Sequence, residues 1–399
     1  MHEKIAQSIA ESASEIIGYG VLVTDENGTI IGCSDVRRVG TKHNPSVEVL
    51  RTANPISTSK EEAASLKGVK PGYTCPIKFF NDLVGTVSIA GPPDKVTRFG
   101  LLVQKHAEMM LREQNILEMK LRREQAIRDL AQSILLYDKT EDKRGILSYA
   151  RGLGYDLECC RIAVILEIVS QPEKDEWDFD KILRRIRNFF TERKHLISVV
   201  ENFQIVLYLA LSCPSDTGEM ETTAARLSQS LLEDLENHGI VALAGVGLEA
   251  HDFNELSRSA RAARMALHTG KLLEGSPNAF DGAQLDTAAK RVHSARELVL
   301  EILLMTLPKE QVPNHIEQIL ATLRNGDADG ELARTFLVWC RNPFASGEVA
   351  QELTIHRNTL QYRLKKIKEI IGLNPWDFHD SFLLWTALTL QQVGQEKTD

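Results

Sequence analysis

Residues 344–372 constrain the fold most, because their pattern predicts two short helices joined by a tight turn. The first helix is expected at residues 346–353 and the second at residues 356–371. Apolar residues of the second helix recur at spacings of four, three and four and would form one buried face: Leu360, Leu364, Ile367 and Ile371. Residues expected to form the small core between the two helices are Val349, Ala350, Leu353 and Ile355. This segment therefore predicts a helix-turn-helix motif.

The opposite side of the second helix is basic and rich in amides, and no carboxylate interrupts it before Glu369. Amides make bidentate contacts to adenine and lysine reaches guanine or phosphate, as a helix in the major groove requires. The residues expected to contact DNA are Arg357, Asn358, Thr359, Gln361, Tyr362, Arg363, Lys365 and Lys366. A solvated surface helix is the alternative, but the short helix, the short turn and the basic-amide face occur together, which favours operator DNA as a partner. Because one such helix covers only a half-site, a homodimer is expected.

This motif also carries a family resemblance. His-Arg-Asn-Thr-Leu-Gln-Tyr-Arg-Leu at residues 356–364, with Lys-Ile at 366–367 and Gly-Leu at 372–373, resembles the C-terminal helix-turn-helix of PucR-type regulators. The resemblance extends from Leu332 onward. It implies a transcriptional regulator without indicating which signal the protein senses.

Composition excludes several classes of protein. The 399 residues carry a net charge of −8, so the chain is not a generally basic nucleic-acid coat, and DNA contacts must come from a local patch. The six cysteines show no Cys-x-x-Cys spacing, so reduced core cysteines and no metal site are expected. The chain opens without a signal-peptide pattern and has no apolar run of membrane-spanning length, so a cytoplasmic location without membrane contact is expected.

The N-terminal third predicts a mixed α/β domain with a small antiparallel sheet. A helix is expected at residues 5–17, and a second one reaches about residue 53, with Asn44 as its N-cap and Pro45 at its first position. The strands are expected at residues 20–24, 29–33, 73–80 and 83–90. Tight turns at residues 25–28 and 81–82 would pair them as two hairpins.

Two cationic loops, at residues 34–44 and 66–72, carry the chemistry of this domain. A helix start at Asn44-Pro45 presents free N–H groups to an anion, and Arg38 adds a bidentate clamp for a carboxylate. The residues expected to bind a small-molecule ligand are Arg38, Gly40, Thr41, His43, Lys70 and Gly72. The alternative is a pair of solvated basic loops. No acid–base pair is poised on a substrate, so binding rather than turnover is expected.

The same loops lie within a second resemblance. Ile-Ile-Gly-Cys-Ser at residues 30–34, Arg-Val-Gly-Thr-x-His at 38–43 and Gly-Val-Lys-Pro-Gly at 68–72 are similar to the sugar-diacid recognition domain of the carbohydrate diacid regulator family (CdaR, or SdaR). The resemblance implies an activator of uptake and breakdown genes that responds to glucarate, galactarate or glycerate. Two positions depart from the family pattern: Val39, which is a conservative change, and Asn44-Pro45, which leaves the pocket shape and so the choice among effectors open.

Residues 99–136 predict one long connecting helix. Leu102, Met109 and Ile116 recur every seven residues, but polar residues occupy the intervening heptad positions, so a strict coiled coil is not supported. Pairing with a second subunit and packing on its own domain are both left open.

The middle of the chain predicts a ferredoxin-like β-α-β-β-α-β-α order that resembles a GGDEF cyclase domain. Its strands are expected at residues 160–169, 196–201, 204–211 and 241–248, and its helices at residues 179–193, 227–237 and 253–267. The hairpin at residues 200–204 has neither the two glycines nor the paired carboxylates of a cyclase. A non-catalytic interaction or relay domain is therefore expected.

Together these patterns predict a multidomain protein, α/β followed by all-α. The expected domains are a sensor at residues 1–134, a degenerate GGDEF-like domain at 135–290 and a helix-turn-helix domain at 291–399. Helices of the last domain, besides the motif, are expected at residues 291–307, 316–323, 332–341 and 382–390, with Gly372 as a C-cap. No catalytic residue and no cofactor is expected.

Two other functions remain as alternatives to a sugar-diacid regulator. One is a PucR-type regulator that senses another hydroxy acid or a purine-pathway metabolite. The other is an enzyme, a nucleotide cyclase or a hydrolase, which the missing cyclase motif and the missing nucleophile–base–acid set disfavour.

Overall fold

The fold comes from a computed structural model, which divides into two compact units, Met1–Glu124 and Gln125–Asp399, each containing one five-stranded sheet. The structure describes residues 3–66, 68–80, 82–138, 142–170, 179–192, 194–200, 204–213, 218–273, 290–308, 312–342 and 345–394. Within these ranges, no helix combines the length and apolar character needed to cross a bilayer.

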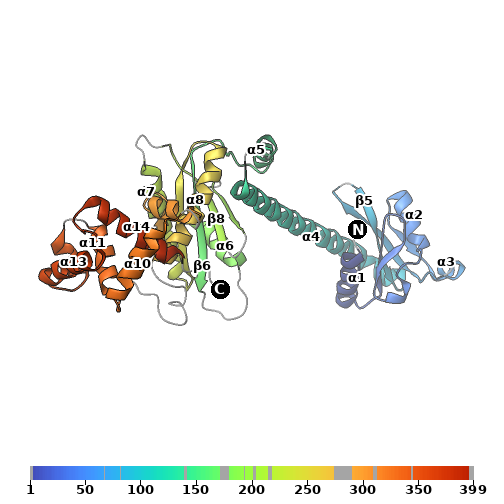
Figure 1. Cartoon of the computed structure of the whole chain (residues 1–399). Helices are drawn as coiled ribbons and strands as arrows, with labels where there is room; N and C mark the ends of the chain where they lie inside the picture. Colours follow the sequence, from blue (N-terminus) through green and yellow to red (C-terminus); the bar gives the residue numbers. More distant parts are fainter. Residues whose placement is uncertain are drawn as a thin grey trace. The chain divides into compact units, whose positions relative to one another are not determined.

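The first unit is an antiparallel sheet with helices on both faces (Figure 1). Its strands, in spatial order, are β2 (Ile30–Cys33), β1 (Val21–Thr24), β5 (Asp82–Ala90), β4 (Gly72–Phe79) and β3 (Ile56–Thr58). Helix α1 (Glu3–Ile17) and the first part of α4 (Pro93–Leu136) bury one face through an apolar core. Helix α2 (Asn44–Thr52) packs on β4 and β5 from the other side.

The two faces of this sheet differ in chemistry because successive strand residues point in opposite directions. Along β5, Val87 and Ile89 belong to the apolar core, whereas Thr86 and Ser88 lie on the side of α2. One face therefore stabilises the domain and the other is lined by hydroxyl groups.

Most predicted elements of the first unit are confirmed, including both hairpins and the helix at residues 5–17. The prediction of Asn44 as N-cap is wrong, since α2 already begins at Asn44 and the extended residue before it is His43. Three elements were not predicted: the 3₁₀ helix η1 (Val36–Arg38), strand β3 and helix α3 (Lys60–Ser65). In the second predicted turn, Asn81 lies outside the described residues.

The second unit begins with a ferredoxin-like domain. Its sheet, in spatial order, contains β10 (Val292–Ser294), β9 (Val241–Ala250), β6 (Arg161–Ser170), β8 (Gln204–Ala210) and β7 (Leu196–Val199). Helices α6 (Phe179–Phe189) and α7 (Glu219–Glu236) cover one face. Helix α8 (Phe253–Leu273), α5 (Lys143–Gly152) and the end of α4 cover the other.

The predicted order of strands and helices in this domain is confirmed, but one predicted helix is partly wrong. Residues 291–307 were expected to be helical, whereas Val292–Ser294 forms β10, parallel to β9, and the helix α9 spans only Val299–Met305. This strand depends on a partner that is distant in sequence, so periodicity did not indicate it. The sheet of the ferredoxin-like domain therefore includes residues beyond 290, where the predicted helical domain begins. The boundaries of the three domains remain predictions. The predicted hairpin turn at residues 201–203 lies outside the described residues.

The C-terminal part of the second unit is helical, as predicted. Its helices after α9 are α10 (Asn314–Gly326), α11 (Glu331–Arg341), α12 (Ser346–Glu352), α13 (Arg357–Ile371) and α14 (Phe378–Gly394). One apolar cluster joins them, and Phe336 and Leu360 at its centre have no exposed surface.

One prediction about the cysteines is wrong. Cys160 and Cys213 form a disulfide with their Cα atoms 5.5 Å apart, while Cys33, Cys75, Cys159 and Cys340 are free. Spacing along the chain did not indicate this pair, because β6 and β8 bring together residues that are 53 positions apart.

Candidate functional site

The helix-turn-helix consists of α12 and α13, and its second helix is closed at both ends by its own residues. His356 is the N-cap of α13, where its Nδ1 accepts a hydrogen bond from the Asn358 N–H at 3.2 Å. At the other end, Gly372 adopts a left-handed conformation with φ of 77°, and its N–H donates to the Lys368 carbonyl. The predicted C-cap is thus confirmed.

The predicted buried face of α13 is also confirmed. Leu360, Leu364 and Ile367 have no exposed surface, and Ile371 is partly buried in the same cluster. The short helix contributes Val349 and Ala350, which are buried as well. This core sets the orientation of α13 on α12.

The turn between the two helices lies at Thr354 and Ile355, as predicted, but the sequence did not indicate the backbone conformation of Thr354. Thr354 has a φ of 55°, a left-handed conformation that costs a residue other than glycine about 1–2 kcal/mol. The turn is held by hydrogen bonds from the Thr354 and Ile355 N–H groups to the carbonyls of Gln351 and Ala350. Tertiary packing therefore overrides the local preference of threonine.

The structure places seven of the eight predicted DNA-contacting residues on the open side of α13. The exposed ones are Arg357, Asn358, Gln361, Tyr362 and Lys365, and the partly exposed ones are Thr359 and Lys366. Tyr362 is 63% exposed, so its phenol ring is accessible on this side of the helix. These seven residues are polar or basic, and none of them is buried.

Arg363 is the exception among the eight. Its guanidinium donates to Glu331 Oε2 at 2.7 Å and to Thr335 Oγ1 at 3.1 Å, both on α11. The Arg363 side chain is only 18% exposed. Its position thus fits a residue that holds α13 against α11.

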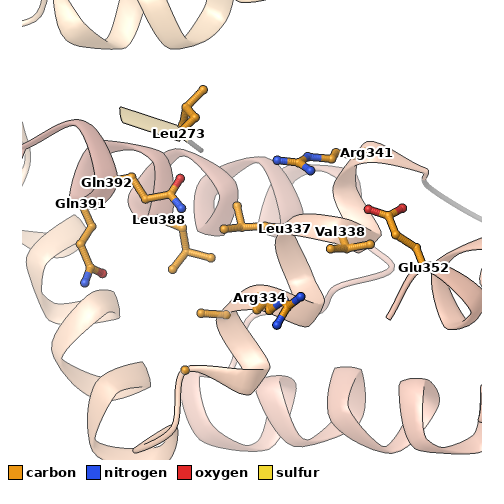
Figure 2. A pocket seen from close by; sticks show the side chains of 11 residues that line it. Leu273, Arg334, Leu337, Val338, Arg341, Glu352, Leu388, Gln391 and Gln392 are labelled. Atoms are coloured by element: carbon orange, nitrogen blue, oxygen red, sulfur yellow. The ribbon is translucent and has the colours of Figure 1, made fainter. Parts of the chain in front are cut away.

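A cavity of about 430 Å³ lies behind this motif, between α11 and α14 (Figure 2). Leu337, Val338 and Leu388 form its apolar wall, while Arg334 and Arg341 bring two guanidinium groups to it. None of the eight predicted DNA-contacting residues is among those that line this cavity.

In the first unit, the two predicted cationic loops meet. Arg38 donates from its guanidinium to the Gly68 carbonyl at 2.8 Å, so the loop at residues 34–44 is tied to the loop at residues 66–72. Thr41 Oγ1 donates to the Arg38 carbonyl at 2.6 Å, and the Gly40 N–H donates to the Ile30 carbonyl. Arg38 is partly exposed, and Lys70 is exposed on the second loop. The structure therefore brings four predicted ligand residues, Arg38, Gly40, Thr41 and Lys70, to one end of the sheet.

His43 lies inward from these loops and is only 3% exposed. Burial, with the positive charge of Arg38 as a smaller cause, lowers the pKa of His43 to about 4, so the ring is neutral near pH 7. Its Nδ1 lies 2.7 Å from Ser46 Oγ, within the first turn of α2. A neutral His43 can still offer one ring N–H or one lone pair to a ligand, but it supplies no charge.

Behind His43 runs a buried chain of hydroxyl groups that sequence reasoning missed. Thr86 Oγ1 donates to Ser46 Oγ at 2.6 Å, and it lies 2.9 Å from Thr24 Oγ1. All three of these hydroxyl-bearing residues have no exposed surface. Beside them, Thr74 Oγ1 donates to Ser88 Oγ at 3.0 Å. The alternation of Thr86 and Ser88 with valine and isoleucine was the signal that could have revealed this polar wall.

Gly72, the remaining predicted ligand residue, is buried in β4. A Cβ at this position would lie 2.3 Å from the Ile89 carbonyl oxygen, so the strand tolerates only glycine there. The Gly72 backbone thus belongs to the packed sheet beneath the second loop.

Comparison with known proteins follows the same division of the chain. Residues 1–134 match the sugar diacid recognition family, residues 138–269 the GGDEF-like domain family and residues 332–390 the PucR C-terminal helix-turn-helix domain family. The carbohydrate diacid regulator of Escherichia coli K12 is 27% identical over 391 residues, 98% of this chain and 97% of that protein.

Two relatives from Bacillus subtilis match over shorter lengths. The proline-responsive transcriptional activator PutR is 21% identical over 277 residues, 69% of this chain and 64% of its own. The purine catabolism regulatory protein is 31% identical over 108 residues, 27% of this chain and 20% of its own. The three matched domains and the full-length relative identify the chain as a transcriptional regulator that resembles the carbohydrate diacid regulators and carries a PucR-type helix-turn-helix domain.

Proposed function

We propose that this regulator binds a sugar diacid or glycerate in its first unit and operator DNA through α13. The observation that supports the effector site best is the Arg38 guanidinium bonded to the Gly68 carbonyl, which joins two cationic loops beside a wall of buried hydroxyl groups. A sugar diacid has a carboxylate at each end, so it matches the two cationic loops that Arg38 joins.

In this site, Arg38 with Thr41 would hold one carboxylate, and Lys70 on the second loop would hold the other. Gly40 and Gly72 would contact the effector through backbone groups, and His43 would contact it through its neutral imidazole ring. Glycerate has one carboxylate and would use the Arg38 end alone. The alternative effector is a different hydroxy acid or a purine-pathway metabolite. The similarity to the purine catabolism regulatory protein is the reason for including the purine-pathway metabolite.

Replacement of Arg38 by alanine is expected to weaken effector binding about ten- to a hundredfold, because a charge-assisted contact contributes about 1.5–3 kcal/mol. Arg38→Lys should recover part of the affinity, since it keeps the charge but loses the planar fork. The measurement is calorimetric titration of the full-length chain with glucarate, galactarate and glycerate.

Lys120→Ala, at an exposed position of α4, is the control and should bind as the unchanged chain does. Unchanged affinity in Arg38→Ala would contradict the assignment of the site. Failure of all three acids to bind at millimolar concentration would contradict the assignment of the effector class.

For DNA, we propose that Asn358 and Tyr362 contact base edges, that Lys366 contacts phosphate, and that Arg363 holds α13 in place through Glu331. The other proposed contacts are Arg357, Thr359, Gln361 and Lys365. These four residues lie on the same open side of α13 as Asn358, Tyr362 and Lys366, which supports their proposed contact with DNA.

Asn358→Ala or Tyr362→Ala is expected to lose about 1–3 kcal/mol on the cognate operator and little on random DNA. Lys366→Ala should weaken binding to both DNAs alike and reduce the salt slope by about one unit, because it removes one phosphate contact. Binding curves at several salt concentrations, on both DNAs, measure this. Equal effects of all three substitutions on both DNAs would refute the division.

We also propose that the protein acts as a homodimer and as an activator. Leu102, Met109 and Ile116 of α4 are all more than half exposed, which favours a second subunit over packing on the same domain. PutR is named as a transcriptional activator, which supports activation rather than repression by this protein. In the GGDEF-like domain, the hairpin sequence without the cyclase motif supports a non-catalytic role.

A further inference from the structure

Three side chains with metal-binding atoms converge at one edge of the second sheet. Cys160 immediately precedes β6, Cys213 follows β8, and His251 immediately follows β9. Strand β6 pairs antiparallel with both neighbours, and Arg161 lies opposite Ala210 and Ala250. The strand register thus brings to one place three residues that are distant in the sequence.

The distances suit a metal site once the disulfide is reduced. The Sγ atoms of the two cysteines and a ring nitrogen of His251 all lie within 4.8 Å of one another. His251 Nδ1 is 3.4 Å from Cys160 Sγ. A tetrahedral zinc ion with Zn–S distances of about 2.3 Å needs ligand atoms about 3.5–4 Å apart, so small side-chain shifts are enough.

The surroundings of His251 supply an independent observation. Its second ring nitrogen, Nε2, lies 3.9 Å from Glu249 Oε1, while its backbone N–H donates to Glu255 Oε2 at 2.8 Å. Metal-binding histidines in proteins commonly pass their other ring N–H to a carboxylate, which orients the ring and strengthens it as a ligand. Glu249 Oε1 is too far from Nε2 for a hydrogen bond in this structure, and a small shift of either side chain would bring it into that position.

We propose that Cys160, Cys213 and His251 bind one thiophilic divalent cation, such as Zn²⁺, when the disulfide is reduced. A dithiol reductant transfers two electrons and two protons to the disulfide and gives two thiols. The cation then displaces both thiol protons, so two protons are released and two metal–sulfur bonds form. Three protein ligands leave the fourth position to water, on the exposed side of Cys213 and His251. Disulfide and metal-bound states exclude each other.

Cobalt is a suitable probe, because thiolate ligands give Co²⁺ a strong charge-transfer absorption band. Full-length protein, reduced and freed of metal, is expected to bind one Co²⁺ per chain with this band and to lose the band when Zn²⁺ is added. The oxidised chain should show no band. Absence of the band in the reduced chain would overturn the proposal.

Variants separate this site from adventitious binding. Cys213→Ser changes an exposed residue and is expected to abolish the band, as is Cys160→Ser. Glu249→Gln should weaken cobalt binding about tenfold, because it removes the carboxylate beside the His251 ring. The matched control is Cys159→Ser, whose Sγ contacts the Asp156 carbonyl and is outside the cluster, and it should retain the band. Cobalt uptake that survives Cys213→Ser would be adventitious and would refute the site.

Discussion

Replacement of Leu364 by alanine is expected to lower the free energy of unfolding of the C-terminal helical domain by about 2–5 kcal/mol and to abolish operator binding. Leu364 has no exposed surface and packs in the cluster that fixes α13 on α12. The substitution removes apolar contacts and leaves a cavity, so the recognition helix loses its fixed orientation. Urea unfolding followed by tryptophan fluorescence reports on this domain, because it holds Trp339, Trp376 and Trp385 among the chain's four tryptophans.

Lys365→Ala is the matched control on the neighbouring position. Lys365 is exposed, and its ion pair with Glu369 is long, at 4.0 Å, so stability should change by less than about 0.5 kcal/mol. Its affinity for DNA should nevertheless fall. An unfolding curve of Leu364→Ala that coincides with that of the unchanged chain would contradict the packing argument.

Acidification from pH 6.5 to pH 4 is expected to destabilise the first unit by about 3 kcal/mol at most through His43 alone. Burial, and next the charge of Arg38, lowers the pKa of His43 from 6.5 to about 4 in the folded chain. Below pH 6.5 the unfolded chain therefore binds a proton that the folded chain cannot bind until about pH 4. The stability associated with a neutral, buried His43 is fully present above pH 6.5. It is lost progressively as the pH falls from 6.5 to about 4.

Comparison with His43→Asn isolates this effect from the carboxylates that titrate in the same range. Asparagine keeps a polar atom near the position of Nδ1, beside Ser46, but does not titrate. Amide hydrogen exchange in peptides from β4 and β5, corrected for the intrinsic pH dependence, measures the local stability in the full-length chain. The variant should show a shallower loss of stability on acidification, and equal slopes in both proteins would exclude His43 as the cause.

The helix-turn-helix was predictable because its determinants are close in sequence. The spacing of Leu360, Leu364 and Ile367 indicated the buried face, and Gly372 indicated the end of the helix. The two hairpins and the ferredoxin-like order were predictable for the same reason, since alternation and turn residues act within a few positions.

Features that depend on distant partners were not predictable. Strand β10 exists because β9 lies beside it, and the Cys160–Cys213 pair exists because β6 and β8 align. Thr354 adopts a left-handed conformation that its own preference opposes. In each case, contacts made by the folded chain outweigh the local pattern.

The candidate sites show the same division. The sequence by itself determined which residues are basic, polar or apolar, where the recognition helix lies and which loops carry positive charge. Only the tertiary structure decided that Arg363 pairs with Glu331, that Arg38 joins the two loops, and that His43 is buried and neutral. The physical reason is that periodicity and turn chemistry act over a few residues, whereas ion pairing, burial and pKa depend on neighbours that only the fold brings together.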